Sequence, residues 1–313
     1  MRVWVIGPGA LGLLMAVRLA EAGAEVGLLD HRPGRAGRLA ESGVCLEHGE
    51  GELRLPLKAS AHPPDLAHCD LAIVCVKAYH TAAVAEALGR HLAPGARALT
   101  LQNGAGNVET LAAALGRERV LGGITSEGAT LVAEGHARHA GTGQSFIGPA
   151  AGEPDAFCHQ VVDLFNAAGF AAQAAAGVPN LIWTKLVINV GINALTAILD
   201  VNNGVLLELA GARRLMELAV DEALAVGRAL GIEFLHADMP EAVRQVARRT
   251  AANISSMRQD VRAARRTEID FINGIVCQKA AELNLAAPIN QALTLLIKAR
   301  EEGYLEQAGR GET

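Results

Sequence analysis

Short apolar runs separated by helical patterns mark the first half of the chain. The runs lie at residues 3–6, 25–29, 71–76, 98–101 and 120–124, and the run at 71–76 is apolar without interruption. Between the first two runs, residues 13–21 place Leu, Met and Val on one helical face. Strands that alternate with helices are typical of a parallel sheet covered by helices. The pattern therefore predicts an α/β domain, with a small hairpin excursion at residues 44–60.

The pattern changes after residue 176. From residue 181 to 299 the apolar positions follow a helical spacing, in segments rich in Ala, Leu and Val. Gly177, Val178 and Pro179 form a suitable hinge between the two patterns. We expect a dinucleotide-binding domain at residues 1–176 and an all-helical substrate-binding and catalytic domain at residues 177–313. Ligands favour the cleft between two such domains.

The composition fits a soluble globular protein. A chain of 313 residues is long enough for two cores, and 50% hydrophobic with 19% charged residues excludes a disordered chain. Aromatic residues make up only 3%, which argues against a stacking platform for single-stranded nucleic acid. The net charge of −5 offers no basic surface for a polyanion. We therefore expect a small-molecule ligand and no nucleic-acid partner.

Neither a membrane span nor a metal site is expected. Residues 181–199 approach membrane length but carry Lys185, Asn189 and Asn193, and the apolar start at residues 1–6 is too short for a signal peptide. His136 and His139 are not joined in the sequence by a cysteine or carboxylate cluster. The scattered cysteines lack a C-x-x-C pair, which indicates free thiols in a reducing cytoplasm. They are Cys45, Cys69, Cys75, Cys158 and Cys277.

A glycine-rich turn follows the first predicted strand and opens the first predicted helix. Gly7, Gly9 and Gly12 match the G-x-G-x-x-G spacing of dinucleotide-binding turns. The first glycine permits a tight turn, the second lets the backbone approach a pyrophosphate, and the third allows close packing of helix and strand. N–H groups at the helix N-terminus then face the anion. The expected cofactor-binding residues of this turn are Gly7, Pro8, Gly9, Ala10, Leu11 and Gly12.

The end of the second predicted strand bears on the choice of cofactor. Asp30 stands there, where a carboxylate can hold the ribose hydroxyls of NAD(H). His31 and Arg32 follow at once, with Arg35 and Arg38 nearby, and these groups suit the 2′-phosphate of NADP(H). The residues by themselves leave both cofactors open.

Polar residues also follow two later predicted strands. Lys77 follows the run at 71–76, and Asn103 follows the run at 98–101. Ligands bind at the carboxyl edge of such sheets, so both residues are candidate ligand contacts. The alternatives are a solvated loop lysine and a turn residue before Gly104.

One face of the first helix of the second half is polar. Lys185, Asn189 and Asn193 recur every four residues on an otherwise apolar helix. A buried amine and two amides need partners, which either a polar ligand or an internal hydrogen-bond network supplies. Because burial lowers the pKa of a lysine, Lys185 is a candidate general acid.

A second polar segment spans residues 253–270. Thr267 and Asp270 fit a helix N-cap with a carboxylate three residues later, so we expect a helix to begin there, with Glu268 facing outward in its first turn. One unbroken helix would hold Ser256 and Glu268 about 18 Å apart, whereas a break lets both approach one site. The alternative for Glu268 is a favourable charge at a helix N-terminus.

These motifs together resemble the ketopantoate reductase family, over nearly the full length of the chain. The matching segments are residues 7–12, 76–79, 101–104, 183–193 with Asn203, and 253–270, in the order of the family. The resemblance implies a Rossmann-type N-terminal domain and an all-α C-terminal domain like that of 6-phosphogluconate dehydrogenase.

The resemblance also implies a role for each matching residue. Lys185 would protonate the ketone oxygen as hydride arrives from the nicotinamide, and Glu268 would anchor the cofactor or a substrate hydroxyl. Lys77 and Asn103 would contact cofactor and substrate, and the loop near Glu127 would touch the cofactor mainly through its backbone. The residues that would hold the substrate are Asn189, Asn193, Asn203, Asn253 and Ser256.

The implied reaction is the reduction of 2-dehydropantoate (ketopantoate) to (R)-pantoate with NADPH, a step of pantothenate and coenzyme A biosynthesis, with NADH left open by Asp30. A reductase of another 2-oxo acid would share these motifs. A non-catalytic dinucleotide sensor is a more distant alternative, and it gives no reason for Lys185 and Glu268. The apolar helices fit a homodimer interface as well as an internal core.

Overall fold

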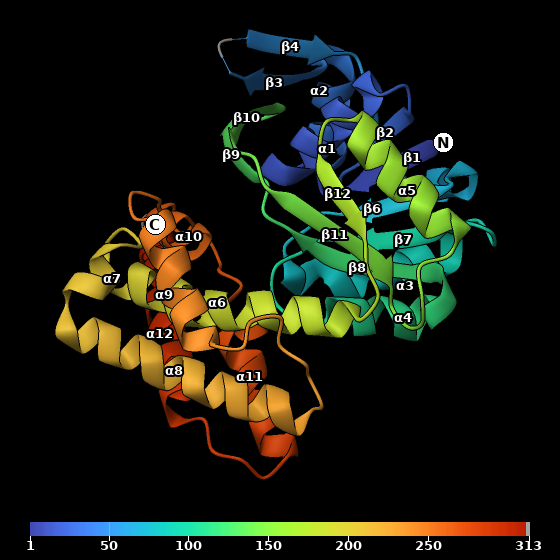
Figure 1. Ribbon diagram of the computed structural model, residues 1–313. Coiled ribbons are helices and arrows are strands. Elements are labelled where there is room, and N and C mark those ends of the chain that lie inside the picture. The colour runs from blue at the N-terminus through green and yellow to red at the C-terminus, as the bar shows by residue number, and fades with distance from the viewer. Residues whose placement is uncertain (50, 311–313) are drawn as a thin grey trace. The chain divides into compact units, whose positions relative to one another are not determined.

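The chain folds into two compact units (Figure 1). The structure is a computed structural model that describes residues 1–49 and 51–310, with side chains through residue 304. Unit 1 comprises residues 1–102 and 107–178, and unit 2 comprises residues 103–106 and the chain from residue 179 onward.

Unit 1 is built on an eight-stranded sheet in the order β12-β11-β8-β7-β6-β1-β2-β5. Neighbouring strands are parallel except for β11, which runs antiparallel to β8. The strands are β1 (Arg2–Ile6), β2 (Glu25–Leu29), β5 (Lys58–Ser60), β6 (Leu71–Val74), β7 (Arg97–Thr100), β8 (Val120–Thr125), β11 (Gln144–Pro149) and β12 (Ala171–Ala174). The predicted α/β domain with a largely parallel sheet is confirmed.

Helices cover both faces of this sheet. They are α1 (Ala10–Glu21), α2 (Pro33–Ser42), α3 (Thr81–His91), α4 (Asn107–Leu115) and α5 (Ala156–Ala167), with the 3₁₀ turns η1 (Pro63–His68), η2 (Ala78–His80) and η3 (Arg117–Arg119). Contacts join α1 to α5 and α3 to α4, and these two pairs lie on opposite faces (Figure 1). Strand β6 is buried along its whole length, as its uninterrupted apolar run predicts.

A second, four-stranded sheet in unit 1 has the order β4-β3-β10-β9. Its strands are β3 (Val44–His48), β4 (Gly51–Leu55), β9 (Gly128–Ala133) and β10 (His136–Gly141). The hairpin expected at 44–60 is formed by β3 and β4, whereas β5 joins the main sheet. The parallel pairing of β3 with β10, which places Cys45 opposite His136, joins segments far apart in the chain.

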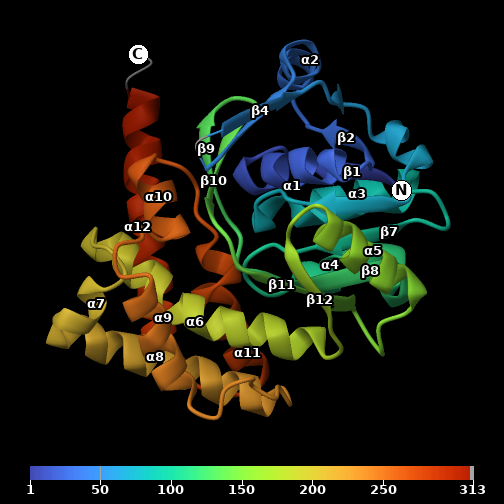
Figure 2. The ribbon, with the colours of Figure 1, turned by 45° about the horizontal axis from the view of Figure 1, so that its top comes forward.

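Unit 2 is helical throughout, apart from its connecting loops. Its elements are α6 (Val178–Leu199), α7 (Val205–Glu208), α8 (Ala210–Ala229), α9 (Met239–Arg249), α10 (Ser256–Arg262), the 3₁₀ turn η4 (Ile269–Phe271), α11 (Asn273–Glu282) and α12 (Pro288–Arg310). Helix α6 lies against α8 and α9 (Figure 2), where a Cβ at Gly191 would approach Val243 to 2.9 Å and Val220 to 3.0 Å. The glycine therefore lets three helices pack closely around one core.

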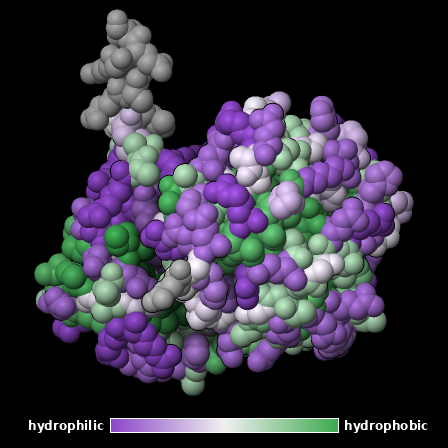
Figure 3. All heavy atoms as spheres, turned by 90° about the horizontal axis from the view of Figure 1, so that it is seen from above, coloured by the Kyte–Doolittle hydropathy of each residue, from purple (hydrophilic) through white to green (hydrophobic). Residues whose placement is uncertain are grey.

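Helix α6 is long and apolar enough to cross a membrane, but 72% of its most apolar window is buried inside the fold. It is therefore the core helix of unit 2. On the face drawn in Figure 3, hydrophilic and hydrophobic side chains are interspersed. Among the described residues, the large hydrophobic side chains that are more than half exposed are Leu235, Leu295 and Leu296.

Candidate active site

The glycine turn between β1 and α1 has the geometry of a phosphate cradle. Gly7 has a φ of +89°, and a Cβ there would lie 2.6 Å from Val76 Cγ1. A Cβ at Gly12 would lie 2.4 Å from the Gly7 carbonyl oxygen, so only glycine allows α1 to start this close to the strand. A Cβ at Gly9 would meet no described atom within 4 Å. The turn is therefore tight beneath Gly7 and Gly12 and open above Gly9.

The start of α1 suits an anion. Gly9 is the N-cap residue of α1 and provides no side-chain acceptor for the N–H groups of the first turn. Those groups and the helix dipole favour a negatively charged ligand at this end. The residues of the turn thus fit the pyrophosphate of a dinucleotide.

Asp30, at the end of β2, is buried and held by internal contacts. Its carboxylate accepts hydrogen bonds from the Arg32 backbone N–H at 2.9 Å and from Arg35 Nη1 at 2.7 Å. Arg35 also donates to the Pro8 carbonyl oxygen, which connects Asp30 to the glycine turn. The negative charge of Asp30 is therefore already paired with the Arg35 guanidinium within the protein.

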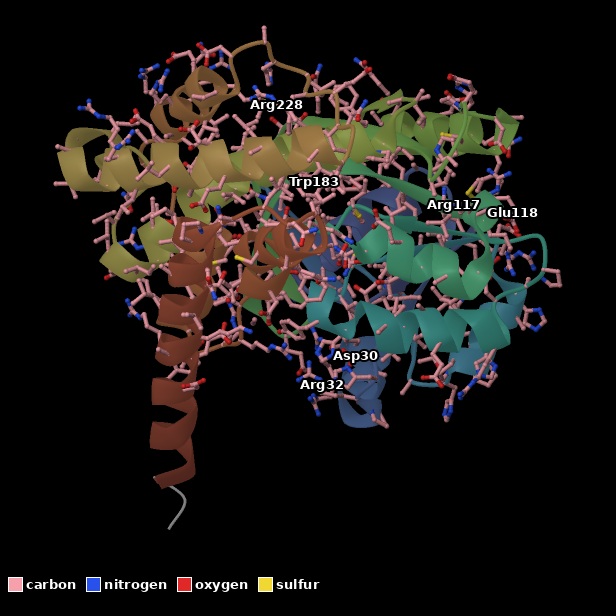
Figure 4. The ribbon with its side chains drawn as sticks, turned by 90° about the horizontal axis from the view of Figure 1, so that it is seen from below. Asp30, Arg32, Arg117, Glu118, Trp183 and Arg228 are labelled. Atoms are coloured by element: carbon pink, nitrogen blue, oxygen red, sulfur yellow. The ribbon has the colours of Figure 1, made fainter. Side chains whose placement is uncertain are left out.

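The two residues after Asp30 are exposed. The side chain of His31 is 76% exposed and that of Arg32 is 57% exposed, whereas that of Asp30 is only 2% exposed. Figure 4 labels Asp30 and Arg32 side by side at the start of the segment that leads into α2. The cationic group in this corner is thus more accessible than the carboxylate.

The loops after β6 and β7 are tied together by Gln102. Its Nε2 donates to the Val76 carbonyl oxygen at 2.6 Å and to Thr81 Oγ1 at 3.0 Å. Val76 immediately precedes Lys77, so Gln102 fixes the backbone from which the lysine extends. Sequence reasoning missed Gln102, although its position directly after the apolar run at 98–101 was an available signal.

Asn103 packs with unit 2, not with the sheet it follows in sequence. The Ala105 N–H donates to the Phe271 carbonyl oxygen at 3.1 Å, and a Cβ at Gly104 would lie 2.4 Å from that oxygen. The loop that follows Asn103 is therefore held to the segment that carries Glu268.

The side chain of Glu127 has internal partners in unit 1. Its carboxylate is 2.6 Å from His139 Nε2 and accepts a hydrogen bond from the Gly143 N–H at 3.2 Å. The Glu127 N–H donates to Thr125 Oγ1 at 3.1 Å. The expected backbone contact of this loop with the cofactor stays a prediction.

Lys185, Asn189 and Asn193 lie on one face of α6. Lys185 and Asn189 are half-buried, and Asn193 is buried. Burial lowers the pKa of Lys185 to about 8, and the charge of Glu268 opposes this effect. Glu268, itself buried, is thus close enough to act electrostatically on the amine.

The two serines at the start of α10 differ in burial and in their contacts. Ser255 is buried, caps α10 by accepting from the Arg258 N–H at 3.2 Å, and lies 2.7 Å from Thr196 Oγ1 of α6. Ser256, the residue expected to bind substrate, is exposed. The buried serine therefore fixes α10 against α6 and leaves Ser256 accessible.

Asn203 carries a buried amide oxygen with no hydrogen-bond partner among the described residues. Its Nδ2 donates to Thr250 Oγ1 at 2.9 Å, and its N–H donates to the Asn253 carbonyl oxygen at 3.2 Å. Asn253 itself is exposed. A buried acceptor without a donor is costly, and a ligand hydroxyl would satisfy it.

The helix expected to begin at Thr267 is not there. The predicted break is present, but η4 covers Ile269–Phe271 and α11 begins only at Asn273. Asp270 pairs with Lys298 at 2.6 Å instead of completing a capping box with Thr267. Glu268 is also buried, so the expectation that it faces outward from a helix end is wrong.

Three potential metal ligands, two from the β3–β4 hairpin and one from the distant strand β10, meet on the second sheet of unit 1. Cys45, Glu52 and His136 bring their ligand atoms within 4.8 Å of one another. The view that no cysteine or carboxylate joins His136 is therefore wrong. His136 is already 3.0 Å from Glu47, and the pKa of the Cys45 thiol is raised to about 11, mainly by burial. A metal requires the thiolate, so the expectation of no metal stays a prediction.

Comparisons with known proteins agree with this arrangement. The family model "Ketopantoate reductase PanE/ApbA" matches residues 3–152, and its C-terminal counterpart matches residues 178–301. The 2-dehydropantoate 2-reductase of Halobacterium salinarum is 40% identical over 97% of this chain and 100% of its own. That of Archaeoglobus fulgidus is 34% identical over 96% of this chain and 98% of its own.

Solved structures show the same fold. A PanE/ApbA family ketopantoate reductase from Ralstonia eutropha superimposes with a TM-score of 0.90 at 31% identity, over 97% of this chain and 100% of its own. D-mandelate dehydrogenase in complex with NADH and anilino(oxo)acetate gives a TM-score of 0.89 at 25% identity, over 97% and 99%. On its motifs, its fold and its relatives, the chain belongs to the ketopantoate reductase family.

Proposed function

We propose that this protein reduces 2-dehydropantoate to (R)-pantoate with NADPH, a step of pantothenate and coenzyme A biosynthesis in the cytoplasm. The observation that carries the proposal is Lys185, an amine of lowered pKa on a buried helix face that also carries Asn189 and Asn193. Full-length relatives at 32–40% identity are named for this reaction. The described cysteines are free thiols, in keeping with a reducing compartment.

The glycine turn of unit 1 would hold the pyrophosphate of the dinucleotide. Bound there, NADPH supplies the hydride of the reduction. The open space above Gly9 admits the phosphates, and the start of α1 donates N–H groups to them. Lys77, on the backbone fixed by Gln102, would add a cation at the carboxyl edge of the sheet.

Lys185 would act as the proton donor. With a pKa of about 8, most of its amine is protonated at neutral pH, yet it loses a proton more readily than an exposed lysine. The ammonium would polarise the ketone and then protonate the developing alkoxide from Nζ. Glu268 would keep the amine charged until that transfer, because its negative charge raises the pKa of Lys185.

Carboxamides and a hydroxyl would bind the rest of the substrate. The free oxygen of Asn203 suits a substrate hydroxyl, and the exposed Ser256 suits the carboxylate at the start of α10. The remaining proposed substrate contacts are Asn103, Asn189, Asn193 and Asn253.

The preference for NADPH rests on the corner after β2. Arg35 pairs with Asp30 at 2.7 Å, whereas Arg32 Nε lies 3.6 Å from the same carboxylate. The Arg32 side chain is also 57% exposed, so its guanidinium can turn to a 2′-phosphate. NADH is the alternative cofactor, because NADH is bound in the structure of D-mandelate dehydrogenase.

Reduction of another 2-oxo acid is the second candidate function. The ligand named in the D-mandelate dehydrogenase complex, anilino(oxo)acetate, carries an oxo group beside its carboxylate, as 2-oxo acids do, and that protein has the same fold. Oxidation of NADPH and of NADH should be followed with 2-dehydropantoate, 2-oxoisovalerate and benzoylformate. The proposal predicts the highest kcat/KM for 2-dehydropantoate with NADPH, and a higher value for either other acid would overturn it.

A further inference from the structure

Helix α12 contacts residues 265–270, the segment that leads into and includes the start of η4, at three points spaced three residues apart along the helix. Lys298 Nζ is 2.6 Å from Asp270 Oδ1, Glu301 accepts hydrogen bonds from Thr267, and the Tyr304 hydroxyl donates to the Arg265 carbonyl oxygen at 2.6 Å. Residues three apart on a helix share a face. One face of α12 thus runs along the segment that carries Glu268.

The central contact of the three is the buried one. Glu301 Oε1 accepts from the Thr267 N–H at 2.8 Å and from Thr267 Oγ1 at 2.6 Å. Thr267 is 2% exposed and Glu301 is 9% exposed, whereas the side chains of Lys298 and Asp270 are 43% and 36% exposed. Hydrogen bonds to a buried carboxylate are the stronger kind, and a buried group that loses its partner is penalised.

This contact fixes the backbone on both sides of Glu268. Thr267 precedes Glu268, and the Thr267 hydroxyl also accepts from the Ile269 N–H at 3.2 Å. The Phe271 N–H then donates to the Glu268 carbonyl oxygen at 3.0 Å. The backbone of Glu268 is therefore restrained on both sides, and its position depends on that of Thr267.

We propose that Glu301 is a positioning residue that holds Thr267, and through it keeps the Glu268 carboxylate beside the Lys185 amine. Glu301 does not touch the reacting atoms in this account. Its part in catalysis rests on the proposed function, whereas its effect on the Lys185 amine does not. Glu268 is the charged group that acts on that amine, and it raises the pKa. Loosening Glu268 should therefore lower the pKa of Lys185 further.

The test is an NMR titration of the lysine amines in the substrate-free protein. The chain has five lysines, Lys58, Lys77, Lys185, Lys279 and Lys298, so Cε–Nζ correlations of a lysine-labelled sample can be assigned, with Lys185→Met identifying the key signal. In Glu301→Ala, the titration midpoint of Lys185 should fall by about half a pH unit or more. Glu301→Gln keeps an acceptor oxygen for Thr267 and should stay close to wild type.

Matched variants separate positioning from general loss of structure. Thr267→Val removes the hydroxyl and should lower the midpoint in the same direction, while Thr267→Ser keeps the hydroxyl and should not. Lys298→Met breaks the exposed outer contact and should leave Lys185 unchanged. A folded Glu301→Ala whose Lys185 titrates as in wild type overturns the proposal; if that variant does not fold, an unshifted midpoint in Thr267→Val does so.

Activity measurements distinguish this proposal from the proposed function. The basic limb of the kcat profile should move to lower pH in Glu301→Ala and Thr267→Val, together with the NMR midpoint. If wild type fails to reduce 2-dehydropantoate, the proposed function falls and the titration still decides the role of Glu301. If wild type is active and both variants keep its kcat–pH profile and its Lys185 titration midpoint, Glu301 has no positioning role and the proposed function still stands.

Discussion

Lys185 and Glu301 are two charged side chains of unit 2, the first half-buried and the second buried. The polar face formed by Lys185, Asn189 and Asn193 was predicted because three polar residues at four-residue spacing stand out on an apolar helix. Glu301 could not be predicted, because one glutamate among the polar residues of α12 resembles any solvated position. Its burial depends on Thr267, which lies 34 residues away.

The partly buried amine of Lys185 should reduce stability. Its folded-state pKa, about 8, lies below the ordinary 10.5, so the folded chain binds this proton less tightly than the unfolded chain. The cost is fully present below pH 8 and fades as pH rises toward 10.5. Lys185→Met should therefore be more stable than wild type at pH 7, by about 2 kcal/mol after allowance for partial exposure.

Urea unfolding at pH 7 and at pH 9.5 checks this prediction, because the advantage of Lys185→Met should shrink at the higher pH. A methionine variant that is less stable than wild type at pH 7 would show that the amine is compensated within the fold.

Cofactor choice is also decided by a single side chain in this account. Because Arg32 is exposed beside an Asp30 already paired with Arg35, Arg32→Ala should raise the Kd for NADPH about tenfold and leave that for NADH nearly unchanged. Arg38→Ala is the matched control, since Arg38 pairs with Glu134. Fluorescence titration with NADPH and with NADH measures both Kd values. If Arg32→Ala weakened the binding of both dinucleotides equally, Arg32 would have no part in the choice between them.

Secondary-structure elements were predicted best where a periodic pattern and a glycine or polar boundary coincide. Strand β2 has the expected bounds, and β1 and β8 each differ from them by one residue. The expected strand at 71–76 ends at Val74, because the chain turns there beneath the tight glycine turn. Strands β9, β10, β11 and β12 went unpredicted. The edge strand β9, for example, is largely exposed and shows no clear alternation.

Two substitutions at the start of α1 should both weaken dinucleotide binding but differ in their effect on stability. In Gly12→Ala the new methyl group would lie 2.4 Å from the Gly7 carbonyl oxygen, so both stability and dinucleotide binding should fall. In Gly9→Ala the methyl group has room in the free protein but occupies the space proposed for the phosphates. We expect this variant to melt like wild type and to bind NADPH at least tenfold more weakly.

Thermal melting with and without NADPH compares the two variants. Since a ligand that binds only the folded state raises the melting temperature, wild type should be stabilised by NADPH and Gly9→Ala much less so. If NADPH raised the melting temperature of Gly9→Ala as much as that of wild type, the phosphates would have to bind away from Gly9.

For the whole molecule, local patterns in the sequence predicted an α/β part followed by a helical part. They did not predict contacts between residues far apart in the chain. The parallel pairing of β3 with β10 and the hydrogen bond from the Ala105 N–H to the Phe271 carbonyl oxygen each join residues more than 80 positions apart. Such contacts are set by the packing of the complete core, which single-sequence periodicity does not encode. The same holds for Cys45 and His136, which are neighbours in the second sheet although no local pattern connects them.

The measurement that tests the account most directly is the turnover of Lys185→Ala with 2-dehydropantoate and NADPH, beside its affinity for NADPH. The proposed proton donor lies in unit 2 and the glycine turn in unit 1, so kcat should fall at least a thousandfold while the Kd for NADPH stays within about threefold of wild type. Lys279→Ala, which removes an amine paired with Glu282, is the control and should keep full turnover. A Lys185→Ala enzyme that turns over like wild type would contradict the assignment of Lys185 as the proton donor.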